Sequence, residues 1–100
     1  SNLDERTRAF TSPLKLFEYM SSNKTIVASA TPTIMEVLNS NNAVLIEPDD
    51  PRALKEGLLK VINDKKEAEF LSKNARKEVE NYTWEKRAVK ILDFLGKHGQ

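Results

Sequence analysis

The residues best suited to binding a ligand lie together in the segment 12–21, which reads SPLKLFEYMS. Ser12 followed by Pro13 is the preferred order of an N-cap and a first helical residue, so a helix is predicted to begin there. The free N–H groups of its first turn form a positive end that can bind a phosphate or a sugar hydroxyl, and Lys15 could neutralise part of the charge of a phosphate. The alternatives are plain N-capping by Ser12 and an ordinary surface position for Lys15.

Glu18 is the one carboxylate of this segment. It falls in the middle of the predicted helix among bulky apolar residues, where a carboxylate without a partner is costly. One interpretation is that Glu18 contacts a ligand. The other is an exposed ion pair with Lys15, which would stabilise the helix by only about 0.2–0.5 kcal/mol.

Composition excludes several classes of protein. At 100 residues the chain is at most one small domain, and a net charge of +1 with 31% charged residues gives no bias toward nucleic acid or a membrane surface. The absence of cysteine excludes disulfides and thiolate metal sites and fits a reducing compartment, so we expect a cytoplasmic protein. One histidine leaves little material for a zinc site. No apolar run approaches the roughly 20 residues that span a bilayer.

Two common catalytic arrangements are also excluded by residue type. The single histidine, His98, lies near the end of the chain, so no Ser–His–Asp arrangement is expected. The three glycines are scattered, at Gly57, Gly96 and Gly99, and they form no phosphate-binding loop. No residue is therefore identified as catalytic, and no metal site is predicted.

Hydrophobic periodicity and turn residues predict helices and short strands in alternation. The expected elements are a helix at 13–22, a strand at 25–29, a short helix at 34–38, a strand at 43–46, and helices at 51–62, 65–82 and 84–95. Both strands are continuous apolar runs, as expected of parallel strands covered on both faces. The order of elements indicates an α/β fold.

Local signals predict how these elements begin and end. Thr33 and Glu36 fit a capping box, in which each side chain binds the other residue's backbone N–H. Asp50 stands before a proline and should cap the next helix. Thr83 should cap the final helix, and Gly96 can end it.

Each helix carries an apolar stripe that is expected to face the core. The four stripes, in chain order, are Leu14, Leu16, Phe17 and Met20; Leu54, Leu58, Val61 and Ile62; Ala68, Leu71, Ala75 and Val79; and Trp84, Ala88, Ile91, Leu92 and Leu95. Trp84 should be a core or interface anchor.

Several motifs, in order and at matching spacing, resemble one protein family. They are SPLKLFEYM, KTIVAS, the turn at 32–36, AVLIEPDD and YTW. They resemble the C-terminal nucleotide-sugar-binding domain of GT-B glycosyltransferases of the retaining family 4 (group 1, glycogen-synthase-like), from Phe10 to Leu95. The resemblance implies the C-terminal half of a Rossmann-like domain, with two short parallel strands and about five helices. Residues 1–100 would be a single fragment of that domain, with Ser1 and Asn2 interpreted as a cloning scar.

The resemblance also implies a donor-binding site. Glu18 matches the second glutamate of a pair spaced eight residues apart, whose carboxylate accepts hydrogen bonds from the ribose hydroxyls of the donor. The first glutamate, thought to contact the transferred sugar, would fall at position 10, where this chain has Phe10. Ser12, Leu14 and Lys15 would lie at the helix end near the diphosphate. The sequence at 11–15 resembles a subgroup of the family, so we interpret Phe10 as variation.

The function implied is that of a hexosyl-type glycosyltransferase in glycan biosynthesis, which transfers a sugar from a nucleotide-activated donor with retention of configuration. No metal or redox cofactor is implied, because such chemistry depends on electrostatic stabilisation of the departing diphosphate. The expected partners are the nucleotide sugar and an N-terminal acceptor domain. The basic residues that the family uses at the diphosphate fall before residue 1, so the chain alone is expected to be inactive. The alternative is a non-enzymatic interaction or assembly module with the same fold.

Two short strands cannot cover the apolar stripes of so many helices, and a two-stranded sheet is marginal on its own. The edge of the strand at 25–29 should therefore recruit another chain. We expect a homodimer or a domain swap, and the competing outcome is a monomer whose final helix folds over the open face.

Overall fold

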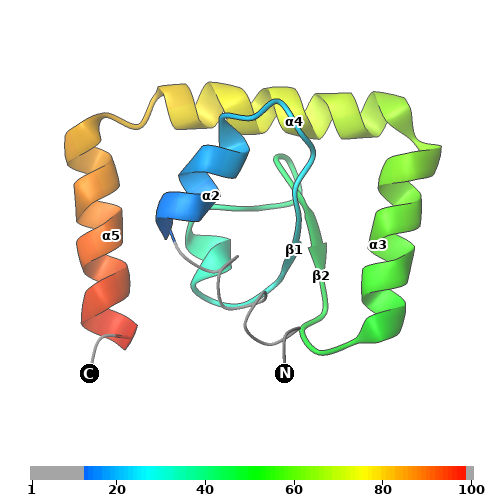
Figure 1. The fold of residues 1–100 in the computed structure, drawn as a ribbon, viewed down its shortest axis with the longest axis horizontal. Coiled ribbons are helices and arrows are strands. Elements are labelled where there is room, and N and C mark those ends of the chain that lie inside the picture. Colours follow the sequence, from blue (N-terminus) through cyan, green and yellow to red (C-terminus); the bar gives the residue numbers. More distant parts are fainter. Residues whose placement is uncertain (1–12, 99–100) are drawn as a thin grey trace.

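The computed structural model describes residues 13–98 and confirms the α/β class (Figure 1). Its elements are α2 (Pro13–Met20), β1 (Val27–Ser29), the 3-10 turn η1 (Ile34–Glu36), β2 (Val44–Ile46), α3 (Pro51–Asn63), α4 (Lys65–Glu80) and α5 (Trp84–His98). The described range thus holds four α-helices and one 3-10 turn, close to the five helices expected. α3 and α5 run from the two ends of α4, and α2 and the strands lie between them (Figure 1).

The two strands form a parallel sheet in which Val27 pairs with Val44. The hydrogen bond to β2 is made by Ile26 and not by Val27, because the Val44 N–H donates to the Ile26 carbonyl at 2.8 Å. Backbone groups of successive strand residues point to opposite edges. Those of Val27 and Ser29 therefore point away from β2, to an edge that carries no strand within residues 13–98.

The hydrophobic core lies between α2, η1, the start of β2 and α4. Its buried members are Leu16, Phe17, Met20, Ile34, Leu38, Ala43, Ala75 and Val79. They confirm the core-facing stripe predicted for α2, apart from Leu14, whose side chain lies outside the described part. In the stripe predicted for α4, Leu71, Ala75 and Val79 are buried and Ala68 is half-buried. Val44 is buried, but the other strand residues are only partly buried, where burial on both faces was expected.

One buried polar side chain ties the loop after η1 to α4. The Asn42 Oδ1 atom accepts from the Asn39 N–H at 2.8 Å, and the Asn42 Nδ2 atom donates to the Val37 carbonyl at 3.3 Å and to the Glu78 carboxylate. Asn42 is fully buried, so these bonds satisfy polar atoms that have no access to water. They fix the turn that leads into β2.

α3 begins as predicted, because the Asp50 carboxylate accepts from the N–H groups of Arg52 at 3.0 Å and Ala53 at 3.2 Å. The prediction that the leucine stripe of α3 faces the core is wrong. Leu54, Leu58 and Ile62 are 41%, 47% and 67% exposed.

The reason is that α3 meets the sheet through Gly57, its one buried residue. A Cβ at this position would lie 2.9 Å from the Ile46 Cγ2 atom, so the helix backbone approaches the strands too closely for a larger residue. Ala53 and Val61, which share this face of the helix at i−4 and i+4, are half-buried. The contact face is therefore offset from the leucine stripe.

The capping box predicted for Thr33 and Glu36 is also wrong, because the Thr33 side chain makes no cap hydrogen bond. Thr31 caps the turn instead. Its hydroxyl accepts from the Ile34 N–H at 3.4 Å, and its carbonyl accepts from the Met35 N–H at 2.9 Å. η1 is a single 3-10 turn over Ile34–Glu36.

α5 begins as predicted, with the Thr83 hydroxyl accepting from the Lys86 N–H at 3.1 Å. The prediction that Gly96 ends the helix is wrong. The helix continues to His98, and a Cβ at Gly96 would meet nothing within 4 Å. A glycine in open space with an ordinary helical backbone has no reason to act as a C-cap.

The apolar face predicted for α5 is mostly exposed. Trp84 is 78% exposed and is therefore not a core anchor, and Leu92 and Leu95 are more than half exposed. Ile91 alone of the predicted stripe packs against the core cluster. No helix within residues 13–98 combines the length and apolar character needed to cross a bilayer.

Candidate functional site

α2 presents Glu18 on its outer face, opposite the buried Phe17 and Met20. The Glu18 carboxylate lies 3.7 Å from the Lys15 ammonium, and both side chains are more than half exposed. The ion pair foreseen as the alternative to ligand binding is thus present. An exposed ion pair of this kind contributes only about 0.2–1 kcal/mol to stability. The carboxylate also keeps free acceptor positions toward solvent.

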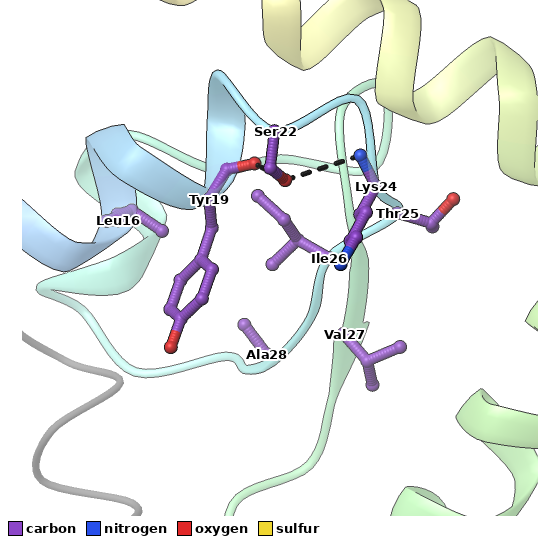
Figure 2. Close-up of a pocket in the computed structure, with 8 residues that line it drawn as sticks. All are labelled: Leu16, Tyr19, Ser22, Lys24, Thr25, Ile26, Val27 and Ala28. Carbon is purple, nitrogen blue, oxygen red and sulfur yellow. Dashed lines mark hydrogen bonds between the residues drawn. The ribbon is translucent and has the colours of Figure 1, made fainter.

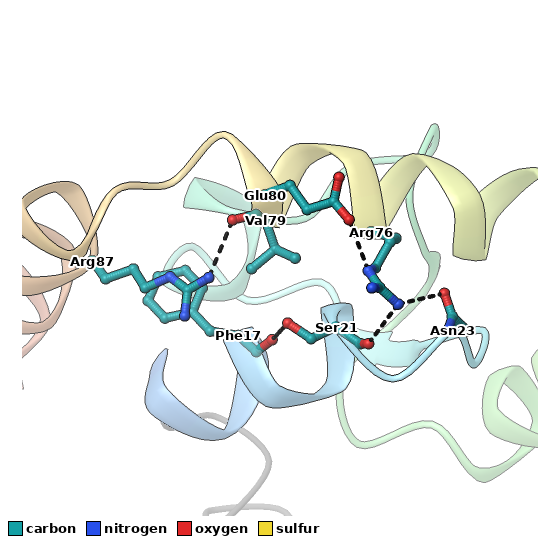
Figure 3. Close-up of polar contacts among 7 residues, drawn as sticks. All are labelled: Phe17, Ser21, Asn23, Arg76, Val79, Glu80 and Arg87. Atoms are coloured by element: carbon teal, nitrogen blue, oxygen red, sulfur yellow. Dashed lines mark hydrogen bonds and ion pairs between the residues drawn. The ribbon is translucent and has the colours of Figure 1, made fainter.

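The far end of α2 is fastened to α4 by Arg76 (Figure 3). The Arg76 Nη1 atom donates to the Ser21 carbonyl at 3.3 Å and to the Asn23 Oδ1 atom at 3.0 Å, while its Nε donates to Glu80 at 3.0 Å. Asn23 has a left-handed backbone with φ of 62°, which places its side chain beyond the helix end. A cation at a helix C-terminus is favourable. This cluster fixes the orientation of α2 and therefore of Glu18.

A cleft of about 440 Å³ lies between α2 and α5. Its lining residues are Phe17, Glu18 and Ser21 from α2, and Trp84, Arg87, Ala88 and Ile91 from α5. Its volume lies in the range of small-molecule sites. Glu18 therefore faces a hollow that also contains a cation and a large exposed aromatic ring.

Arg87 holds the two walls of this cleft together. Its guanidinium carbon lies 5.7 Å from the centre of the Phe17 ring and 4.9 Å from the centre of the Trp84 ring. Its Nη2 atom donates to the Val79 carbonyl at 3.2 Å (Figure 3). Phe17 also packs against Tyr82, with ring centres 5.3 Å apart.

A second hollow, of about 230 Å³, lies beside β1 (Figure 2). It is lined by the end of α2 and by β1 together with the residues before it, through Leu16, Tyr19, Ser22 and residues 24–28. Its walls are mainly apolar, and one hydrogen bond, from the Lys24 N–H to the Ser22 hydroxyl at 3.3 Å, closes its rim. This groove lies beside β1, whose free edge pairs with no other strand among the described residues.

The structure thus brings together two of the four predicted donor-binding residues, Glu18 and Lys15. Ser12 and the side chain of Leu14 lie outside the described part, so their roles stay predictions. Sequence reasoning missed Arg87 and Arg76, since a single arginine in a helix carries no motif. Within residues 13–98, no group of three or more His, Cys, Asp or Glu residues is placed to hold a metal ion.

Comparison with known proteins decides the family. Residues 11–78 match the glycosyl transferases of group 1. The chain belongs to this family. The match includes the whole of α2, both strands and η1, so four of the five motifs that resembled the family lie within it, and YTW at 82–84 lies beyond it.

Among solved structures, this group 1 chain is similar to the sucrose-phosphate synthase from Thermosynechococcus elongatus. The TM-score is 0.65 at 26% sequence identity, covering 84% of this chain and 22% of that one. The chain therefore spans about a fifth of the length of that enzyme. No curated protein sequence matches the chain significantly.

Proposed function

We propose that the chain is part of the donor-binding domain of a glycosyl transferase that moves a hexose from a nucleotide-activated donor to an acceptor with retention of configuration. The observation that carries the proposal is the group 1 family match, which includes α2 and Glu18. Family membership supports glycosyl transfer, and the position of Glu18 supports a role in binding the donor. We place this reaction in the cytoplasm and assign it no metal or redox cofactor.

The arrangement of α2 fits a donor nucleotide laid along the helix. Lys15 and Glu18 are one turn apart on the exposed face. The donor's ribose hydroxyls would donate to the Glu18 carboxylate. Its diphosphate would lie toward Lys15 and the positive helix start, a region to which the sequence assigns Ser12 and Leu14. Binding would replace the weak Lys15–Glu18 pair with charge-assisted bonds to the ligand.

The chain alone should not transfer sugar. It spans about a fifth of the similar sucrose-phosphate synthase chain, and the proposed reaction needs an acceptor domain and further cations at the diphosphate. In the proposed enzyme, this unit supplies the ribose contact and part of the diphosphate contact. Turnover of a nucleotide sugar by the purified 100-residue chain would contradict this division of roles.

Titration of the isotope-labelled chain with UDP and GDP tests the proposal. We expect backbone signals of residues 12–18 to shift with at least one of the two nucleotides. Glu18→Ala should weaken binding at least about tenfold, because a hydrogen bond to a charged group contributes about 1.5–3 kcal/mol. Glu56→Ala removes an exposed glutamate from α3 and should leave affinity unchanged. If neither nucleotide shifts these signals, the chain is better interpreted as a non-enzymatic interaction or assembly module.

We also propose that β1 is an assembly edge. Val27 offers its backbone donor and acceptor at that edge, and the neighbouring groove is apolar. Donor and acceptor on one edge are self-complementary, so a second copy could pair with it antiparallel about a two-fold axis.

A further inference from the structure

We propose that the cleft between α2 and α5 binds a phosphorylated sugar, with Arg87 as the phosphate contact and Glu18 as the acceptor for the sugar hydroxyls. The Glu18 contact rests on the proposed function. The Arg87 contact rests on how α5 packs against α2 and α4, and Arg87 lies outside the region 11–78 that matches the family.

Arg87 is a cation whose hydrogen-bonding capacity is mostly unused. A guanidinium has five N–H donors, and within residues 13–98 only the bond from Nη2 to the Val79 carbonyl is formed. Its Nε is buried without a partner, although buried polar atoms are almost always satisfied. No carboxylate of the described residues forms an ion pair with it. A phosphate in the cleft would supply a negative charge and acceptors for the remaining Nη donors of Arg87, whereas the buried Nε is closed to solvent.

The guanidinium is also held in a fixed orientation before any ligand binds. It lies between the Phe17 and Trp84 rings and is anchored to Val79 at one nitrogen. Contact with aromatic faces suits a weakly hydrated guanidinium and leaves its planar donor fork available at the edge. Little side-chain freedom therefore remains to be lost when a planar or tetrahedral anion binds.

The remaining walls select for a hydroxyl-bearing ring rather than for a simple anion. Glu18 only accepts hydrogen bonds and repels negative charge, so its side of the cleft favours hydroxyl donors. Trp84 presents a large ring that is 78% exposed, against which an apolar ring face can pack. A phosphate at one end and hydroxyls at the other describe a phosphorylated sugar.

Two kinds of molecule carry this chemistry. One is a free sugar phosphate, and the other is a nucleotide, whose ribose bears a 5′-phosphate. Glucose 6-phosphate and UMP are suitable probes, and unphosphorylated glucose and uridine are their matched controls.

Trp84 is the only tryptophan of the chain and lines the cleft, so its fluorescence reports on binding directly. We expect a saturable change with glucose 6-phosphate or with UMP, and an affinity at least about tenfold lower for the unphosphorylated control. The probe that binds identifies the source of the phosphate. Equal binding of phosphorylated and unphosphorylated partners, or no binding of either phosphate, would overturn the inference without any need for a variant.

Variants are best compared by calorimetry, because loss of the guanidinium alters the emission of Trp84 by itself. Arg87→Gln should weaken binding at least about tenfold, and Arg87→Lys should restore only part of it, since an ammonium keeps the charge but lacks the fork. Arg52→Gln, which removes the same charge from exposed α3, should have no effect. Thermal melts followed by circular dichroism show whether each variant is folded at the titration temperature.

Lys15→Gln separates this inference from the proposed function. If Lys15→Gln weakens UDP binding and Arg87→Gln leaves the binding of both glucose 6-phosphate and UMP unchanged, the cleft site is refuted and the donor site along α2 stands. If Arg87→Gln abolishes binding of the phosphate probes while UDP never shifts residues 12–18, the Arg87 site stands and the donor proposal fails. Unchanged binding in Glu18→Gln would refute the hydroxyl contact.

Discussion

Gly57 and Gly96 both lie inside helices, yet replacing them with alanine should have opposite effects on stability. An interior glycine destabilises a helix by roughly 0.5–1 kcal/mol relative to alanine. At Gly96 a Cβ would meet nothing within 4 Å, so the variant should gain up to that amount. At Gly57 the same Cβ would lie 2.9 Å from the Ile46 Cγ2 atom and 3.4 Å from Cγ1 atoms of Val27 and Val44.

The clash with Ile46 decides whether Gly57→Ala stabilises or destabilises the chain. Favourable carbon contacts lie near 3.5–4.0 Å, so α3 or Ile46 must move by roughly 0.6 Å or more. Overpacking of this kind costs about 1–3 kcal/mol, which exceeds the gain in helix propensity and leaves a net loss of about 1 kcal/mol. For a domain of this size, a change of about 1 kcal/mol shifts Tm by roughly 4–8 °C.

Urea unfolding followed by circular dichroism measures both variants in one assay. The Ile46→Ala background removes the clashing methyl, so Gly57→Ala should there recover the propensity gain, as a double-mutant cycle would show. If Gly57→Ala stabilised the chain as much as Gly96→Ala does, α3 would not pack on the sheet through Gly57, and the corrected contact face would be refuted.

Other expectations concern a pair of neighbouring aspartates and the state of assembly. Asp50→Ala removes the side chain that caps α3 and should cost about 1 kcal/mol. Asp49→Gly should instead increase the free energy of unfolding by about 0.5–1 kcal/mol, because Asp49 has a left-handed backbone with φ of 57°. If both variants changed the stability measured by urea unfolding in the same direction, this expectation would be wrong. Light scattering at several protein concentrations should give a mass above that of the monomer, and a single monomeric mass at high micromolar concentration would refute the assembly edge at β1.

The sequence was most informative where local chemistry alone determines structure. Asp50 and Thr83 cap helices as predicted, since an N-cap depends only on the next three residues. The buried face of α2 followed from helical periodicity. The capping box at Thr33 failed because Thr31, two residues earlier, offers a competing oxygen to the same turn.

Tertiary contacts account for what the sequence could not predict. A leucine stripe shows that α3 has an apolar side, but the choice of the Gly57 face depends on how closely the helix approaches Ile46. The importance of Arg87 likewise could not be predicted from the sequence alone. Its position between Phe17 and Trp84 exists only once α5 has packed against α2.

This dependence has a consequence for α5. Much of the helix is exposed, and it meets the core mainly through Ile91 and Arg87. A ligand that bridges Arg87 and Glu18 would bind only when α5 is docked on α2, so its binding free energy would also stabilise the docked helix. Hydrogen exchange in α5 should then slow in the presence of a bound phosphate ligand, while exchange in α3, at the other end of α4, should stay the same.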